Sequence, residues 1–163
     1  MPIKVGDRIP DVKLTTMTPD GPQPVQSGEA LGKGKVVLFA VPGAFTPTCS
    51  EKHLPGFLVR ADDMKAKGVD SIACIAVNDA FVMGAWGASQ DADGQLTFLA
   101  DGNGHFTAEM GLEMDGSGFG LGTRSQRYAA IVEDGVVTEL LVEPAPGLDV
   151  SSAESILAKL QGD

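Results

Sequence analysis

Val36-Val-Leu-Phe-Ala-Val-Pro-Gly-Ala-Phe-Thr-Pro-Thr-Cys-Ser50 contains the sharpest change of character in this sequence. An apolar, β-branched run ends at the pair Pro42-Gly43. A short polar stretch with a second proline follows, and then comes Cys49. This order predicts a buried strand over Lys35–Val41, a turn, and then the N-terminus of a helix.

The predicted place of Cys49 has a chemical consequence. A thiol in the first turn of a helix faces unpaired backbone N–H groups and the positive end of the helix dipole, and both favour the thiolate. Because the thiolate is the nucleophilic form, the segment predicts a reactive Cys49. The alternative is an inert buried thiol, since free cysteines are often buried.

Composition restricts the class of protein. The 163 residues, 43% of them hydrophobic, predict a single domain over residues 1–163 with one core. Twelve basic against 22 acidic residues give a formal charge of −10, which disfavours nucleic acid and anionic membranes as partners. No apolar run approaches the roughly 18 residues of a membrane span, and we expect no signal or transit peptide.

Cysteine usage points to the compartment. The two cysteines form no Cys-x-x-Cys pair and have no metal-ligand spacing, so we expect neither a disulfide scaffold, nor a metal site, nor a cofactor. Free reactive thiols persist in a reducing environment, and we therefore expect a cytoplasmic protein.

Hydrophobic periodicity predicts an alternation of strands and helices. We expect a strand near Val12–Thr15 followed by loops, and further strands over Lys35–Val41, Ser71–Val77 and Leu96–Ala100. We expect helices over Ser50–Lys67, from an N-cap at Asp79 to Ala88, and over His105–Met110, followed by an irregular Gly111–Gly122. Asp134-Gly135 predicts a two-residue hairpin turn between Tyr128–Glu133 and Val136–Val142, and Asp149 or Ser151 should cap a last helix that ends near Leu160. Pro55 should bend the helix predicted over Ser50–Lys67 or break its hydrogen bonds. The order predicts an α/β fold, a mixed sheet with helices on both faces.

Two motifs carry a family resemblance. Pro42-x-x-x-Thr46-x-x-Cys49, with His53-Leu-Pro-Gly-Phe57 after it, resembles the active-site motif of the peroxiredoxins, in particular of their type II branch, which includes plant type II and mammalian atypical two-Cys enzymes. Gly122-Thr-Arg-Ser-Gln-Arg-Tyr128 resembles the arginine segment of that branch, and Phe81–Gly87 also fits. The resemblance extends from Ile3 to the final helix. It implies a thioredoxin-like fold, with a central mixed β-sheet flanked by helices, and thiol-dependent peroxidase activity.

The resemblance assigns roles to the first motif. Cys49 would attack the distal oxygen of a peroxide and become a sulfenic acid, with release of water or an alcohol. The Thr46 hydroxyl would accept a hydrogen bond from the peroxide and donate one to the sulfur or the leaving oxygen, although it could also cap a helix. Pro42 would shield the sulfur, or simply end the strand, and backbone N–H groups near Gly43 and Cys49 would bind peroxide oxygens.

Arg124 is the candidate cation. A guanidinium beside Cys49 would lower the thiol pKa and donate to the oxygens of the transition state. Composition alone would make Arg124 a surface residue, and its place in the second motif favours the active site. Arg127 is the close competitor, which we expect in a supporting role.

The two histidines leave one alternative open. His53 follows Cys49 by four residues, so a helix would place both on one face and a Cys–His hydrolase dyad is conceivable. No Asn or Asp that would orient the imidazole is evident, which favours a structural role for His53 or a role in supporting the residues of the active site. His105 is too far away in sequence to suggest a shared metal site.

Cys74 is the second cysteine and a possible resolving residue. It lies inside an apolar predicted strand, and a disulfide needs Cα atoms within about 7 Å. A residue in the middle of a packed strand would not reach Cys49 without local unfolding, so we favour a buried structural thiol. The relatives with a resolving cysteine near the C-terminus differ from this chain, which has none there.

Several apolar residues have two possible roles. Trp86, Phe81, Met83 and Phe119 fit the core, or the apolar rim of a homodimer interface beside the active site, which the resemblance implies.

The sequence therefore favours a peroxidase for hydrogen peroxide and small alkyl hydroperoxides. Thioredoxin or glutaredoxin with glutathione would recycle it. The rival hypotheses are a thioredoxin-like peroxide sensor or binding module without turnover, and a cysteine hydrolase that uses Cys49 and His53.

Overall fold

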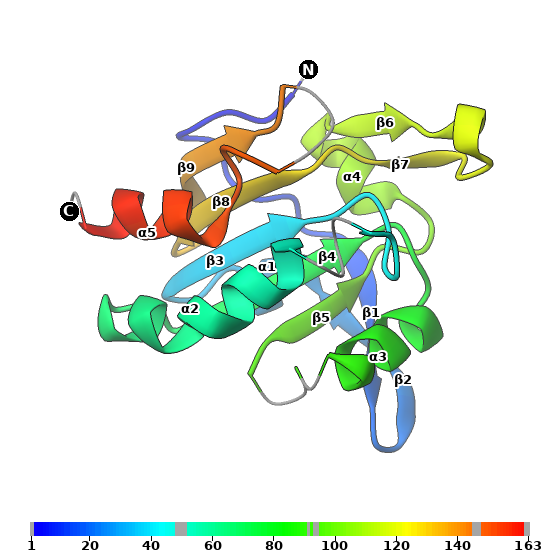
Figure 1. The fold of residues 1–163 in the computed structure, drawn as a ribbon, viewed down its shortest axis with the longest axis horizontal. Coiled ribbons are helices and arrows are strands. Elements are labelled where there is room, and N and C mark those ends of the chain that lie inside the picture. The colour runs from blue at the N-terminus through cyan, green and yellow to red at the C-terminus, as the bar shows by residue number, and fades with distance from the viewer. Residues whose placement is uncertain (1, 48–51, 91, 93–94, 145–147, 162–163) are drawn as a thin grey trace.

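The computed structural model describes residues 2–47, 52–90, 92, 95–144 and 148–161. Its centre is a seven-stranded sheet in the order β2-β1-β5-β4-β3-β8-β9 (Figure 1). These strands are β1 (Lys13–Thr18), β2 (Gly21–Gln26), β3 (Lys35–Ala40), β4 (Ser71–Ala76), β5 (Thr97–Ala100), β8 (Tyr128–Glu133) and β9 (Val136–Val142). A separate two-stranded ribbon consists of β6 (Glu113–Asp115) and β7 (Thr123–Ser125). The helices are α1 (Ser27–Ala30), α2 (Leu54–Ala66), α3 (Ala80–Ser89), α4 (His105–Met110) and α5 (Ala153–Gln161), with a 3₁₀ turn at Ser117–Phe119.

Strand direction makes the sheet mixed. β3, β4 and β5 run parallel, whereas β1 is antiparallel to β5 and β8 is antiparallel to β3. Parallel neighbours need long crossovers, and α2 and α3 supply them. The predicted α/β class and its central mixed sheet flanked by helices are confirmed.

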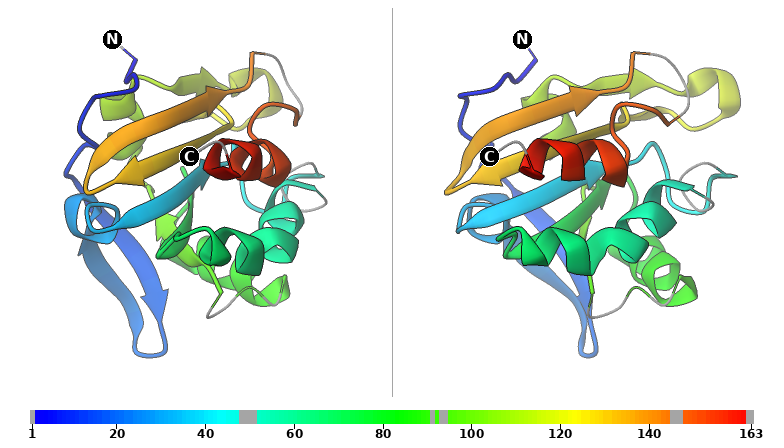
Figure 2. Two further views of the ribbon diagram at one scale, coloured as in Figure 1. Left: turned by 90° about the vertical axis from the view of Figure 1, so that its left-hand side faces the viewer. Right: turned by 60° about the vertical axis from the view of Figure 1, so that its left-hand side comes forward.

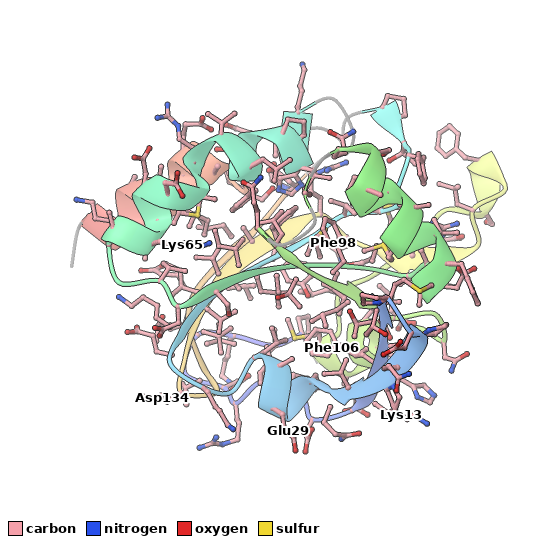
Figure 3. All side chains as sticks on the ribbon, turned by 90° about the horizontal axis from the view of Figure 1, so that it is seen from below. Lys13, Glu29, Lys65, Phe98, Phe106 and Asp134 are labelled. Atoms are coloured by element: carbon pink, nitrogen blue, oxygen red, sulfur yellow. The ribbon has the colours of Figure 1, made fainter. Side chains whose placement is uncertain are left out.

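Helices cover both faces of the sheet. α2, α3 and α5 pack on one face, with α2 and α5 side by side, whereas α1, α4 and the N-terminal segment contribute to the core on the other face (Figures 1 and 2). Phe98 belongs to the first core cluster and Phe106 to the second, and Figure 3 shows them on opposite sides of the sheet. Phe39 of β3 stacks on Phe57 of α2 with ring centroids 4.1 Å apart, which fixes the start of α2 over the sheet.

The N-terminal prediction was incomplete. The structure extends the expected strand near Val12–Thr15 to β1 and pairs it with β2, in a stretch expected to be loops. Pro22 and Pro24 lie in β2, which is the edge strand, where a missing N–H is tolerated. The irregular Gly111–Gly122 likewise contains β6 and the 3₁₀ turn.

Two helix boundaries also differ from the prediction. Pro55 lies in the first turn of α2, where its missing N–H costs no hydrogen bond within α2. The described residues directly before α2, Lys52 and His53, are π-helical, which agrees with the predicted break in the regular hydrogen bonding rather than with a bend inside α2. The predicted start of this helix at Ser50 falls outside the described residues. The cap of α5 is Ser152, whose hydroxyl accepts from the N–H of Ser155 at 3.2 Å, and neither Asp149 nor Ser151 fills that position.

Other local predictions are confirmed. Asp79 caps α3 by accepting from the N–H of Val82 at 2.8 Å. Asp134 and Gly135 turn between β8 and β9 with φ of 50° and 86°, as a two-residue hairpin requires. In the part of the chain that is described, no helix is both long and apolar enough to cross a membrane.

Candidate active site

The turn after β3 lies at the carboxyl end of two parallel strands. The N–H of Ala44 donates to Oδ1 of Asn78, which follows β4, at 3.0 Å. Within the turn, the Thr46 hydroxyl donates to the carbonyl of Gly43 at 2.6 Å. Phe45 between them has φ of 65°, a conformation that is strained for a bulky residue and is typical of functional turns. The turn is therefore held by a hydrogen bond to the segment after β4 and by a second hydrogen bond within the turn itself.

Arg124 of β7 contacts this turn, although the two are 82 residues apart in the sequence. Its Nη1 donates to the carbonyl of Pro42 at 3.2 Å, and its Nε donates to the carbonyl of Leu121 at 3.0 Å. A Cβ on Gly43 would lie 2.9 Å from Nη1 of Arg124 and 3.2 Å from Cγ2 of Thr46. The structure thus brings together four predicted site residues: Pro42, Gly43, Thr46 and Arg124.

Cys49 lies outside the described residues, between Pro47 and Lys52. Its roles as nucleophile and in peroxide binding remain predictions. The described residues on either side of it are placed: the Pro42–Thr46 turn before it, and His53 after it.

Arg127 contacts His53, which follows Cys49 in the sequence. Its Nη1 donates to Nδ1 of His53 at 2.9 Å, and Nε2 of His53 lies 2.9 Å from the carbonyl oxygen of Ser151. Because a guanidinium can only donate and a carbonyl can only accept, Nδ1 must be the acceptor and Nε2 must carry the proton. Both arginines of the second motif therefore lie near the residues that flank Cys49, Arg124 on the turn and Arg127 on His53.

His53 is unsuited to act as a general base. Burial, followed by the charge of Arg127, lowers its pKa from 6.5 to about 3, although the bond to Ser151 and the charge of Glu143 oppose the shift. Its Nδ1 lone pair is occupied by Arg127 and its Nε2 proton by Ser151. The geometry favours the predicted structural role and argues against the hydrolase dyad.

Cys74 lies in the central strand β4. It pairs with Phe39 on one side and Phe98 on the other, and its side chain is fully buried in the core beneath the helices. A thiol at this position has no contact with solvent, in agreement with the prediction of a buried residue.

The apolar residues with two possible roles divide between them. Trp86 and Met83 are buried in the core, whereas Phe81 is 68% exposed and Phe119 is 89% exposed. Phe45, in the turn before Cys49, is also 55% exposed. Only Phe81 and Phe119 of the four are available to an interface.

Metal chemistry has no counterpart in the residues that the structure describes. Among them, no three His, Cys, Asp or Glu side chains gather in a way that could hold an ion. His105 is exposed at the start of α4, whose buried residues belong to the core cluster on one face of the sheet, whereas His53 packs against Phe39 in the core on the other face.

Comparison with known proteins decides the family. The family model Redoxin matches residues 4–157. Peroxiredoxin-2E-2, chloroplastic, of Oryza sativa subsp. japonica is 51% identical over 97% of this chain and 72% of its own length, and Peroxiredoxin-2B of Arabidopsis thaliana is 47% identical over 98% and 99%. The crystal structure of reduced Prx3 from Vibrio vulnificus in complex with hydrogen peroxide superposes with a TM-score of 0.93, at 55% identity over 97% of this chain and 99% of the other.

The chain belongs to the peroxiredoxin family. Its relatives are peroxiredoxins of the type II group, and the expected thioredoxin-like fold is confirmed. The protein is an oxidoreductase, a thiol-dependent peroxidase, and this activity stands over the alternative of a sensor without turnover.

Three residues around the peroxiredoxin site were not foreseen. Asn78 holds the turn after β3, and Glu143 and Ser151 anchor His53 from the segment after β9. Asn78 follows a predicted strand, where site residues of parallel sheets collect, so that position was a usable signal. Glu143 and Ser151 have no local signal, because their role comes only from packing.

Gly43→Ala should slow peroxide reduction with little loss of stability. The new Cβ would press on Nη1 of Arg124, the end of a flexible side chain that can move away, so the site is disturbed more than the fold. We expect a decrease in kcat/KM of about tenfold or more, as for a misplaced catalytic group. Steady-state kinetics and urea unfolding measure both effects. Unchanged kcat/KM would mean that peroxide reduction does not depend on the position of Arg124 against Gly43.

His53→Phe should reduce the loss of stability in acid. The unfolded protein protonates His53 below pH 6.5, whereas the folded protein resists protonation down to about pH 3, so the wild-type stability falls as the pH falls between these values. Between pH 7 and pH 4.5, protonation of His53 in the unfolded protein should lower the free energy of unfolding of wild type by about 2–3 kcal/mol, at ~1.4 kcal/mol per pH unit. Urea unfolding at the two pH values measures it, with His105→Gln as the control. An equal decrease in wild type and His53→Phe would contradict the buried neutral imidazole.

Proposed function

We propose that Cys49 is the nucleophile of this peroxidase. Its thiolate attacks the distal oxygen of the peroxide, the S–O bond forms as the O–O bond breaks, and the leaving oxygen takes up a proton. The cysteine is oxidised to a sulfenic acid, and hydrogen peroxide or a small alkyl hydroperoxide is reduced to water or an alcohol. The observation that supports this assignment is the contact of Arg124 with Pro42 and Gly43, which joins the two motifs directly before Cys49.

The turn supplies the groups that this reaction needs. The Thr46 hydroxyl donates its proton to the Gly43 carbonyl, so the lone pairs of the hydroxyl oxygen can accept a hydrogen bond from the peroxide. The backbone N–H groups of Gly43 and Cys49 are the proposed donors to peroxide oxygens. Pro42 is half-buried at the end of β3, where its ring would limit access of water to the sulfur.

Two arginines would favour the thiolate. Arg124 is proposed as the catalytic cation, because it contacts the turn that precedes Cys49. Arg127 is proposed to support it from the interior, through the residue one helical turn after Cys49. A guanidinium stabilises a nearby anion and can donate to the oxygen on which charge develops.

An external thiol would complete the cycle. Because Cys74 is buried inside the sheet, the Cys49 sulfenic acid would react with a small thiol or a donor protein, through a mixed disulfide. Glutathione with glutaredoxin, or thioredoxin, is the proposed reductant, and no nucleic acid or membrane takes part.

The assembly and compartment are further proposals. Residues 1–163 would form one peroxiredoxin domain, since the described residues share one central sheet. A homodimer would bury the exposed Phe45, Phe81 and Phe119, and the cytoplasm would keep both cysteines reduced.

Cys49→Ser should abolish peroxide consumption while leaving the fold intact. Serine is nearly isosteric, but its hydroxyl is far too weakly acidic to attack the peroxide. Consumption of hydrogen peroxide, measured with thioredoxin and with glutaredoxin plus glutathione as donors, tests both the nucleophile and the reductant. Activity of Cys49→Ser above a few per cent of wild type would remove Cys49 from this role.

Arg124→Ala should weaken the thiolate and slow the reaction. We expect a higher pH midpoint for alkylation of Cys49 and a decrease in peroxide reduction of about 10²–10³-fold, as for loss of one transition-state donor. Iodoacetamide alkylation followed by peptide mass spectrometry gives the midpoint. Arg127→Ala is the matched comparison. If only Arg127→Ala moves the midpoint, Arg127 is the catalytic cation.

Oxidised protein should contain a Cys49 sulfenic acid and no Cys49–Cys74 disulfide. Dimedone should trap the sulfenic acid, and excess peroxide should convert it to the sulfinic form. Cys74→Ser should cost about 1–3 kcal/mol of stability, because it buries a hydroxyl, and should leave turnover nearly unchanged. Non-reducing peptide mass spectrometry decides: a dominant Cys49–Cys74 pair, with loss of turnover in Cys74→Ser, would show that β4 opens during catalysis.

A further inference from the structure

Met17 of β1 lines an open groove of about 550 Å³ on the face of the sheet that α2, α3 and α5 cover. The groove lies between β1, the middle of α3 and the start of β5, and α3 contacts both strands (Figure 1). Its other apolar lining residues are Pro19, Leu96 and Phe98. Met17 is half-buried, so it can be reached from the groove while it also packs against the core.

We propose that Met17 is a site of oxidation by peroxide, and that its sulfoxide releases α3 from β1. The thioether sulfur attacks one peroxide oxygen, the S–O bond forms as the O–O bond breaks, and the proton of the attacked oxygen passes to the leaving oxygen. Sulfur loses two electrons, and the peroxide is reduced to water or an alcohol. The oxidant is the substrate of this peroxidase. The reaction does not involve Cys49 and adds a second site to the one proposed above.

A missing side chain on α3 lets Met17 approach the helix. A Cβ on Gly84 would lie 2.8 Å from Cγ and 2.9 Å from Cβ of Met17, closer than real side-chain contacts allow. Three residues later, a Cβ on Gly87 would lie 2.9 Å from Cε2 of Phe98 in β5. α3 therefore packs on both strands through its glycines, and Met17 fills the space beside Gly84. An unbranched thioether suits such an irregular gap.

The sulfoxide is poorly suited to this contact. Oxidation turns an apolar side chain into a polar one, whose oxygen needs hydrogen-bond donors. The Thr16 hydroxyl, which lines the same groove, already donates to the carbonyl of Phe98 at 2.9 Å. The Thr18 hydroxyl, also in the groove, donates to the carbonyl of Gly21 at 2.7 Å. The sulfoxide oxygen is therefore better solvated by water, and a side chain that turns toward water leaves its place beside Gly84.

α3 connects this contact to the active-site turn. Asp79 caps the first turn of α3, and Asn78, directly before it, accepts from the N–H of Ala44 at 3.0 Å. Because a helix moves as one rigid element, loss of the contact at Gly84, in the middle of α3, loosens this anchor of the turn. Oxidation of Met17 thus lowers peroxidase activity when peroxide is in excess.

The buried methionines of the chain provide internal standards for the oxidation. They are almost fully buried in the core: Met64, Met83 and Met110. In Cys49→Ser, which carries no thiol at that position, hydrogen peroxide should oxidise Met17 at least about tenfold faster than these three, because they are shielded from the oxidant. Peptide mass spectrometry gives the rate at each residue. Equal rates at Met17 and at the buried methionines would overturn the proposal.

Two variants separate the effect of Met17 on α3 from that of oxidation elsewhere. Met114 is half-buried like Met17, but it lies in the separate β6–β7 ribbon. In the Cys49→Ser background, Met114→Leu keeps the thioether of Met17, whereas Met17→Leu keeps that of Met114. After peroxide treatment, amide hydrogen exchange in α3 should become about tenfold faster in the first variant and stay unchanged in the second. Methionine sulfoxide reductase should reverse the change. The same exchange in both variants would rule out release of α3 by Met17.

Met17→Gln tests the effect on catalysis, with Met17→Leu as the matched control. Glutamine keeps an unbranched side chain and introduces a polar group, as the sulfoxide does, whereas leucine stays apolar. We expect kcat/KM for hydrogen peroxide to fall about threefold or more in Met17→Gln and to stay at the wild-type value in Met17→Leu. Equal kcat/KM in the two variants would contradict the link from α3 to the turn. If Met17→Gln fails to fold, the exchange experiment decides.

The proposed function fails in a different way. Wild type that consumes no peroxide, or Cys49→Ser that consumes it normally, would contradict the role of Cys49. Sulfoxide formation at Met17 and hydrogen exchange in α3 are both measured in Cys49→Ser, so neither result depends on that role.

Discussion

The antiparallel pairing of β3 with β8 is the constraint on which the site depends. Its register places Ala40, the last residue of β3, opposite Tyr128, the first residue of β8. The segment that leaves β3 and the segment that enters β8 therefore meet at one edge of the sheet. The parallel pairing of β3 with β4 brings Asn78 to the same edge, where it holds the turn. The backbone hydrogen bonds of β3 with β4 and with β8 thus bring together three segments that are distant in sequence, independently of the catalytic side chains.

Two arginines lie at different depths at this end of the sheet. Arg124 is partly buried and donates to the backbone carbonyl of Pro42 in the turn and to that of Leu121, three residues before Arg124. Arg127 is buried and bonds to a neutral imidazole. A low-dielectric interior strengthens the effect of such charges on a thiol, since water cannot screen them. A chain with a net charge of −10 in this way concentrates positive charge at one place.

The buried position of Cys74 restricts its chemistry. Cys74 is enclosed by neighbouring strands and by the helices above them, where reaction would require the sheet to open. The segment of Cys49 follows a turn with an exposed aromatic side chain, Phe45. With Cys74 enclosed, the proposed sulfenic acid on Cys49 would be recycled by a thiol from another molecule, and it would be open to further oxidation.

The sequence alone determined the α/β class, most element positions, the family and the members of the first motif. These follow from local rules: apolar periodicity, turn chemistry at Asp134-Gly135, the cap at Asp79, and a motif whose residues are contiguous. It missed β2, because prolines disfavour strands everywhere except at an edge, and edge position is a property of the whole sheet. It left Arg124 and Arg127 in competition, and it gave no sign of Glu143. Only the tertiary structure decided which backbone groups and rings these side chains meet, because those contacts depend on strand register and helix packing across the full length of the chain.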